Sequence, residues 1–133
     1  MNSVAICLKT ISDEKSLALF NAVAAESVNT DTLLKKLRLS RKQYYVRISR
    51  LAKAGLIKRK NGIYSLSSLG KVICGAQNLI QKAVDNYWKL KAIDSMGLSE
   101  DGTEFSGEER REIIDSLIGK ESKIKDILNY KSR

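Results

Sequence analysis

Apolar side chains recur at helical spacing in the first part of the chain. The pattern predicts one helix from Asp13 to about residue 29, and a second, shorter helix that begins at Thr30 or Asp31. The apolar positions of these two helices are Leu17, Phe20, Val23, Ala24, Leu33, Leu34 and Leu37. Residues 1–12 fit either a short strand or a leading helical turn, and we expect an N-terminal extension that packs on this domain or on a second copy.

A third helix is predicted to begin after Ser40 and to end near Ala54. Ser40 and Gln43 have the spacing of a capping box, in which each side chain accepts a hydrogen bond from the other residue's backbone N–H. Gly55 is suited to end the helix because Gly readily adopts a left-handed conformation. The arc expected to face the core holds Tyr44, Tyr45, Ile48, Leu51 and Ala52, with both tyrosines in the core rather than stacking on bases.

A two-stranded hairpin is predicted directly after this helix. Two short runs flank Asn61-Gly62, a dipeptide that favours a type I′ turn because both of its residues tolerate positive φ. The register that follows pairs Ile57 with Leu66 and Arg59 with Tyr64.

The pattern then changes to heptads, and Ser67 or Ser68 is placed to cap a long helix over residues 69–96. Its a and d positions are Leu69, Ile73, Ala76, Ile80, Ala83, Tyr87 and Leu90. A stripe of this length favours a dimerisation helix that pairs with a second copy. The alternative is packing against the last helix of the same chain.

The remainder of the chain is predicted as a loop over residues 97–107 and a C-terminal helix over residues 108–133, capped by Ser106 and Glu109. With the N-terminal extension (1–12), a helix–hairpin core (13–68) and the long helix, this layout predicts a mainly α fold with a small β-hairpin.

Positive charge is concentrated in the first part of the chain. The 133 residues carry a net charge of +9, and residues 1–75 hold 14 Lys and Arg against 4 Asp and Glu. Between Lys35 and Lys60 there are 11 basic residues and no acidic one. Charge of one sign at this density favours a polyanionic partner, and the alternative is a basic face that only keeps the protein soluble.

The composition argues against an enzyme. The chain has no His, which removes the commonest general base, and we find no Gly-rich phosphate loop, no metal site and no sign of a cofactor. Cys7 and Cys74 are interpreted as buried apolar residues of a reducing compartment, with a redox-sensing pair as the alternative. The absence of a signal peptide and of a membrane span predicts a cytoplasmic protein.

The segments Leu51-Ala52-Lys53-Ala54-Gly55-Leu56-Ile57 and Leu66-Ser67-Ser68-Leu69-Gly70 flank the predicted basic hairpin. Helix, Gly turn and basic hairpin together resemble the recognition helix and wing of winged helix-turn-helix transcriptional regulators, of the small prokaryotic or archaeal MarR-like or ArsR-like group. The resemblance covers roughly residues 14–94. It implies a winged helix-turn-helix with long C-terminal dimerisation helices, which binds double-stranded DNA as a homodimer and regulates transcription, usually by repression.

The resemblance places the recognition helix in the major groove and the hairpin on the DNA backbone or minor groove. On the outer arc Gln43 suits adenine, Arg47 and Arg50 suit guanine, and Val46 suits a thymine methyl group. The full set of expected DNA contacts is Lys35, Lys36, Arg38, Ser40, Arg41, Lys42, Gln43, Val46, Arg47, Arg50, Lys53, Lys58, Arg59, Lys60 and Asn61.

Three other functions stay open from the sequence. The first is an architectural DNA-binding protein with weak sequence preference, the second a protein-interaction module, and the third a protein that binds structured RNA. The sequence also leaves room for a small-molecule effector where the first helix meets the dimerisation helix, but it identifies no ligand.

Overall fold

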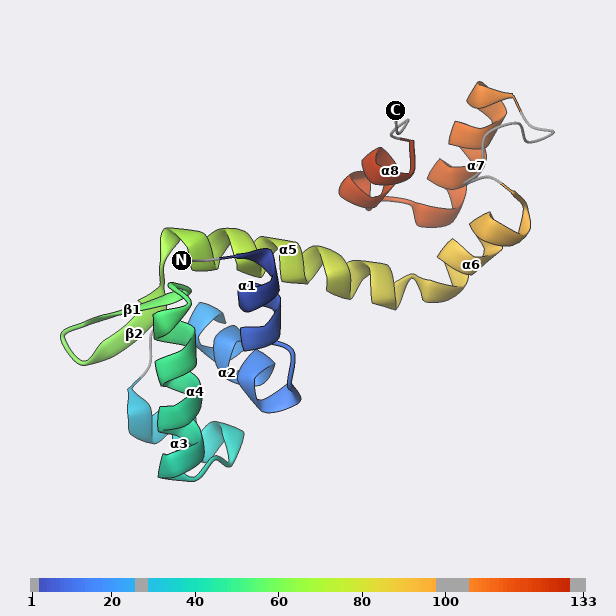
Figure 1. Ribbon diagram of the computed structural model, residues 1–133. Coiled ribbons are helices and arrows are strands. Elements are labelled where there is room, and N and C mark those ends of the chain that lie inside the picture. The colour runs from blue at the N-terminus through green and yellow to red at the C-terminus, as the bar shows by residue number, and fades with distance from the viewer. Residues whose placement is uncertain (1–2, 26–28, 98–105, 130–133) are drawn as a thin grey trace. The chain divides into compact units, whose positions relative to one another are not determined.

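The computed structural model describes residues 3–25, 29–97 and 106–129 (Figure 1). It is mainly helical with one antiparallel hairpin, as the hydrophobic pattern predicted. The chain divides into an N-terminal unit (Met1–Ala76) and a C-terminal unit (Gln77–Arg133). The elements in order are α1 (Val4–Thr10), α2 (Glu14–Ala25), α3 (Thr30–Leu37), α4 (Arg41–Lys53), β1 (Ile57–Lys60), β2 (Ile63–Leu66), α5 (Ser68–Asp85), α6 (Tyr87–Ser95), α7 (Gly107–Ile118) and α8 (Ser122–Asn129).

The first helices of the N-terminal unit follow the predicted pattern, with a correction at one cap. Asp13 caps α2, since its carboxylate accepts a hydrogen bond from the Ser16 backbone N–H at 3.1 Å. The cap of α3 is Asn29 rather than Thr30 or Asp31, because the Asn29 side chain accepts from the Thr32 N–H at 3.0 Å. The predicted end of the first helix, near residues 27–29, falls partly outside the described residues.

The capping box of α4 is confirmed. The Ser40 hydroxyl accepts from the Gln43 N–H at 3.1 Å, and Gln43 Oε1 accepts from the Ser40 N–H at 3.0 Å. Gly55 follows the helix with a φ of 80°, a conformation that Gly adopts without strain. Local sequence therefore determines both ends of this helix.

The hairpin has the predicted register, with Ile57 opposite Leu66 and Arg59 opposite Tyr64. Asn61 and Gly62 have φ angles of 54° and 75°, as a type I′ turn requires. Ile57 and Leu66 are buried at the base of the hairpin, whereas the side chains of Lys58, Arg59 and Lys60 are exposed.

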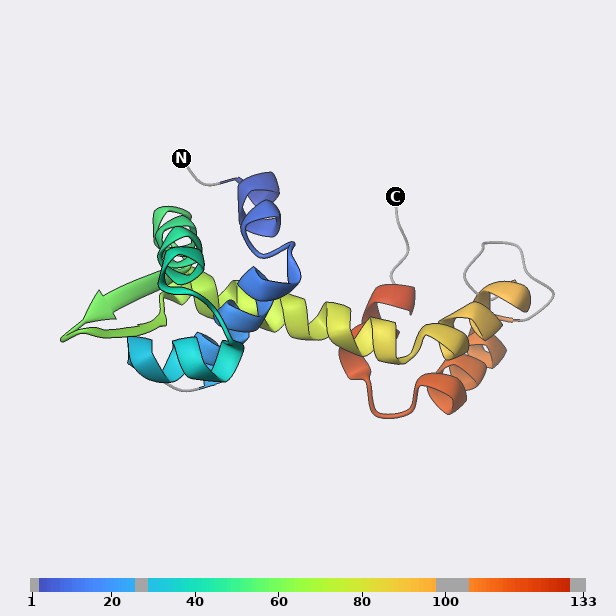
Figure 2. The same cartoon turned by 90° about the horizontal axis from the view of Figure 1, so that it is seen from below.

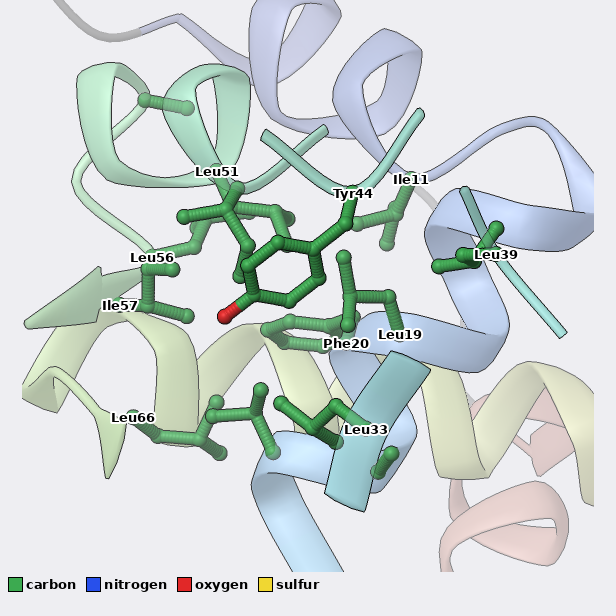
Figure 3. Close-up of a cluster of buried hydrophobic side chains, with 14 of the residues drawn as sticks. Ile11, Leu19, Phe20, Leu33, Leu39, Tyr44, Leu51, Leu56, Ile57 and Leu66 are labelled. Carbon is green, nitrogen blue, oxygen red and sulfur yellow. The ribbon is translucent and has the colours of Figure 1, made fainter. Parts of the chain in front are cut away.

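The core of the N-terminal unit is built around the Tyr44 ring, which Figure 3 shows among side chains of α2, α4 and the start of the hairpin. The ring is completely buried. The N-terminal segment is a helix rather than a strand, and its residues Cys7 and Ile11 belong to this core. The segment therefore packs on its own domain. Cys7 and Cys74 are both thiols, and Cys74 is partly buried against the same core.

The core-facing arc of α4 is narrower than predicted. Tyr44, Ile48 and Leu51 are buried, but Tyr45 is 54% exposed and Ala52 is also exposed. The Tyr45 ring instead makes a T-shaped contact with the Tyr44 ring, with the ring centroids 5.3 Å apart. The physical reason is the spacing of side chains around a helix. Tyr44, Ile48 and Leu51 lie on one face of α4, which packs against the core, and the next residue after Tyr44 or Leu51 is turned away from that face.

The base of the hairpin is fixed to the start of α5. Ser67 caps α5, since its hydroxyl accepts from the Gly70 N–H at 2.9 Å and donates to the carbonyl of Gly55. The Ser67 N–H donates to the carbonyl of Leu56 at 3.1 Å. The end of α4, the base of the hairpin and the first turn of α5 are therefore held together by hydrogen bonds.

Two helices that the sequence predicted as continuous are broken. The long helix over 69–96 divides at Asn86, whose side-chain amide and backbone N–H both donate to the Lys82 carbonyl, at 2.7 Å and 3.1 Å, a side-chain-to-backbone contact of the kind that bends helices. The C-terminal helix divides at Gly119, whose φ of 67° ends α7. Gly107, assigned to the preceding loop from the sequence, is the first residue of α7, and most of that loop, residues 98–105, lies outside the described residues.

The C-terminal unit has its own core, in which α7 and α8 pack against α6 and the end of α5 (Figure 2). Its buried residues are Ile93, Ile114, Ile118 and Ile124, with Leu79, Leu90, Ile113, Leu117 and Leu128 packed against them. Two ion pairs of 3.5 Å, Lys82–Glu121 and Lys125–Asp115, lie on its surface. In this unit the apolar stripe of the long helix is partly covered by helices of the same chain, which was the alternative to pairing with a second copy.

Candidate nucleic-acid interface

The predicted DNA-contacting residues come from the end of α3, from α4 and from the hairpin, all in the N-terminal unit. Every basic side chain between residues 35 and 60 is exposed except that of Arg47, which is half-buried. The structure therefore leaves nearly all of this charge available to a polyanion.

The outer face of α4 forms an exposed stripe of Lys42, Val46, Arg50 and Lys53. Their spacing of three to four residues places them on one side of the helix. Val46 is 41% exposed and contributes an apolar side chain to this stripe. Tyr45 borders this stripe and was missed as a surface residue, because the sequence contains no signal that separates it from the adjacent, buried Tyr44.

Gln43 and Arg47 differ from the rest of the outer arc because both make contacts within the chain. Gln43 Oε1 is used in the capping box. Arg47 Nη1 donates to the Gln43 carbonyl at 3.3 Å, and Arg47 Nε lies 3.4 Å from Asp13 Oδ2. Nothing in the sequence indicates the contact with Asp13, because Arg47 lies in α4 and Asp13 lies just before α2.

The pKa of Asp13 is lowered from its ordinary value, mainly by a hydrogen bond from the Ser16 side chain. The Ser16 backbone N–H and the Arg47 guanidinium lower it further, while partial burial opposes them. Asp13 is thus a stable anion beside α4. This anion compensates the charge of Arg47 within the protein.

Arg41, one of the expected DNA contacts at the start of α4, lies beside α3. Arg41 forms an ion pair of 3.5 Å with Asp31, and both side chains are largely exposed. Arg38 ends α3 in the left-handed conformation, with a φ of 53°. An exposed ion pair contributes little energy, so Arg41 remains available to exchange its carboxylate for a phosphate.

The hairpin presents its basic side chains away from the core. The Arg59 guanidinium lies over the Tyr64 ring, 5.6 Å from its centroid, which orients it by a cation–π contact. Lys58 and Lys60 are exposed on the same strand, and Asn61 is in the turn. The hairpin projects from the helices of the N-terminal unit and exposes three basic side chains (Figure 1).

A pocket of about 430 Å³ lies between α1 and α4. Its lining residues are Ile6, Lys9, Thr10, Ser12, Asp13 and Arg50. A second pocket, of about 310 Å³, lies within the C-terminal unit and is lined by the apolar residues Leu79, Ile80, Ala83, Leu90, Ile124, Ile127 and Leu128. Neither has the arrangement of polar groups that would identify a particular small molecule.

The seven predicted dimerisation residues do not form one exposed stripe. Leu69 and Ile73 pack on the core of the N-terminal unit, and Leu90 packs on that of the C-terminal unit. Ala76, Ile80 and Tyr87 are exposed, and Ala83 is half-buried. Two apolar residues outside the predicted stripe, Val84 of α5 and Trp88 of α6, are 61% and 76% exposed.

Within residues 3–25, 29–97 and 106–129, no three His, Cys, Asp or Glu side chains are grouped so that they can hold a metal ion. The described helices include none with the length and apolar character needed to cross a membrane. Comparisons with protein-family models, with curated proteins and with solved structures find no match to this chain.

Proposed function

We propose that this protein is a sequence-specific, double-stranded DNA-binding transcriptional regulator that acts as a homodimer. In this proposal the N-terminal unit is a winged helix-turn-helix, with α4 as the recognition helix in the major groove and the β1–β2 hairpin as the wing. The observation that carries the proposal is the exposed, one-sided charge of α4 and the hairpin, where no acidic residue lies between Lys35 and Lys60.

The geometry supports a division of work between the two elements. An exposed helix face that carries Arg50, Val46 and Lys42 suits the major groove, where base edges and thymine methyl groups are displayed. The hairpin has basic residues with few other polar groups near its tip, which suits contact with phosphates. We therefore assign base reading to α4 and backbone binding to the hairpin.

Selection of bound sequences from random DNA tests this proposal, because it reveals a preferred site and its symmetry together. Arg50→Ala should then weaken binding to the preferred site by about 1–3 kcal/mol and relax the preference at one base pair. Lys60→Ala should weaken binding to all sequences alike and reduce the salt dependence of affinity. Equal, sequence-independent effects of the two substitutions would contradict base reading by α4.

An architectural DNA-binding role is the second candidate. It is favoured by the contacts of Gln43 and Arg47 within the chain, which leave fewer side chains of α4 free to read bases. Such a protein would bind through phosphates, with a steep dependence on salt and no selected sequence. The same selection experiment separates the two candidates.

The homodimer is supported by exposed apolar side chains in the C-terminal unit, among them Val84 and Trp88. The distribution of charge also supports a dimer formed through this unit. Residues 76–133 hold 10 basic and 11 acidic side chains, so two copies of this part do not repel each other, whereas two copies of the strongly basic N-terminal part do. A dimer would present two recognition helices roughly 34 Å apart to successive major grooves.

A further inference from the structure

The contact between α4 and the start of α2 is unlike the other contacts of the basic surface. The Arg47 side chain is only 20% exposed and folds back along α4, where Nη1 donates to the Gln43 carbonyl. Its Nε is buried and lies 3.4 Å from Asp13 Oδ2, without completing a hydrogen bond. The guanidinium is thus held between two elements of the protein rather than directed to solvent.

A comparison with the ion pair between Arg41 and Asp31 shows why the burial matters. That pair joins α3 to α4 at a similar distance, 3.5 Å, but its side chains are 69% and 74% exposed. Water screens an exposed pair and side-chain entropy opposes it, so its contribution is small. In the other pair the Asp13 side chain is 48% exposed, but Arg47 is only 20% exposed, so removal of Asp13 would leave the charge of Arg47 poorly compensated.

Asp13 also holds the first turn of α2 through the Ser16 N–H. One carboxylate therefore caps α2 and compensates the charge of a side chain from the middle of α4. If Arg47 turned towards a base, Asp13 would lose its cation, and the partly buried contact between α4 and the residue that caps α2 would be lost as well. The energy gained at the base would be reduced by that loss.

We propose that Arg47 is a positioning residue, which holds the recognition helix against the N-terminus of α2, and that it does not read a base. The inference rests on the proposed function, because it concerns how α4 is presented to DNA. It changes the role expected from the sequence, which placed Arg47 beside Arg50 as a guanine reader. Base reading by Arg on this helix is then the task of Arg50, whose side chain is exposed.

The test is a double-mutant cycle of Asp13→Asn and Arg47→Ala, read by thermal unfolding. Asn caps a helix about as well as Asp, so Asp13→Asn removes the charge and keeps the cap of α2. Arg47→Lys is the rescue variant, because it restores a cation but not the planar guanidinium that suits a guanine edge. Asp31→Asn is the matched control, since it removes the carboxylate of the exposed pair.

We expect Asp13→Asn and Arg47→Ala each to lower Tm by a few degrees, about the shift that loss of a partly buried pair produces in a domain of this size. The Tm of the double variant should be no lower than that of the less stable single variant, because both changes break the same contact. Arg47→Lys should recover much of the loss, and Asp31→Asn should leave Tm nearly unchanged. Additive Tm losses in the cycle would overturn the proposal.

DNA binding supplies the second readout. Asp13→Asn and Arg47→Ala should both weaken binding to the selected site, by roughly threefold to tenfold, and should leave the preferred base at every position unchanged, as expected for a contact that only orients α4. A lost preference at one base pair in Arg47→Ala, with full affinity in Asp13→Asn, would show that Arg47 reads a base. If the wild-type protein selects no sequence, the proposed function fails, and the Tm cycle still decides whether Arg47 holds α4 to α2.

Discussion

At the scale of single residues, Tyr44 has the largest fully buried side chain in the N-terminal unit. Its hydroxyl lies 3.3 Å from the Thr30 hydroxyl, so the same side chain fills the core and joins α4 to the start of α3. Burial raises the pKa of Tyr44 above its ordinary value of 10.0, because the core disfavours the phenolate. The folded protein therefore keeps this residue neutral.

This raised pKa predicts a loss of stability in alkali. Ionisation of Tyr44 stabilises the unfolded chain once the pH exceeds about 10. The folded chain is not stabilised in this way until the pH reaches its higher pKa. The free energy of unfolding should therefore be unaffected by this group below pH 10 and should fall as the pH rises towards the folded-state pKa. Tyr44→Phe should show a shallower fall, measured by urea unfolding at about pH 8 and pH 10.5, with exposed Tyr45→Phe as control. An equal fall in the free energy of unfolding between the two pH values for the wild type and Tyr44→Phe would contradict a raised pKa of Tyr44.

At the scale of elements, the junction of α4, the hairpin and α5 depends on a close approach of two backbones. A Cβ atom added to Gly70 would lie 1.9 Å from the carbonyl oxygen of Leu56, and a backbone atom cannot move aside as a flexible side chain can. Leu56 is also bonded to Ser67, which caps α5. The position of α5 against the segment that joins α4 to β1 is therefore determined partly by the absence of a side chain at residue 70.

Gly70→Ala and Gly75→Ala form a matched pair in α5. Gly70→Ala should destabilise the protein by about 3 kcal/mol, because the added methyl group forces the helix away from the hairpin. Gly75 has no atom within 4 Å of the added Cβ, so Gly75→Ala should stabilise the protein by about 0.5–1 kcal/mol through higher helix propensity. Urea unfolding of both variants measures the difference. Similar stabilities would show that α5 does not approach Leu56 this closely.

At the scale of the whole molecule, each unit has its own hydrophobic core, and charge is divided unequally along the chain. The strongly basic part contains α4 and the hairpin, while the charge-balanced part contains Val84 and Trp88; exposed apolar side chains, such as Val4 and Val72, also occur in the basic part. This division fits one part that binds a polyanion and another that binds a second copy.

The proposed dimer predicts a particular result in sedimentation. The wild type should sediment as a dimer at micromolar concentration, and Val84→Glu should shift it towards the monomer because a charge would be buried in the interface. Val84 is largely exposed in the single chain, so the variant should keep its fold. Lys89→Glu, an exposed position on α6, is the control and should remain dimeric. A wild-type monomer at this concentration would contradict the dimer.

The sequence was sufficient wherever neighbouring residues decide the structure. The capping box of Ser40 and Gln43, the Asn61-Gly62 turn and the register of the hairpin are local, because their hydrogen bonds join residues close in the chain. The clustering of positive charge is also a property of the sequence, and the structure adds only that most of it is exposed.

Tertiary structure decided what depends on residues far apart in the chain. Periodicity placed Tyr44 and Tyr45 on one arc, and only packing with other helices buried the first and exposed the second. The heptads continued through Asn86, but the helix breaks there, and C-terminal helices cover part of the stripe. The sequence placed Arg47 on the outer face of α4. The fold brings Asp13, 34 positions earlier in the chain, beside it. The sequence pattern of a helix shows which residues lie on the same face. Which other residues pack against that face is determined by the fold.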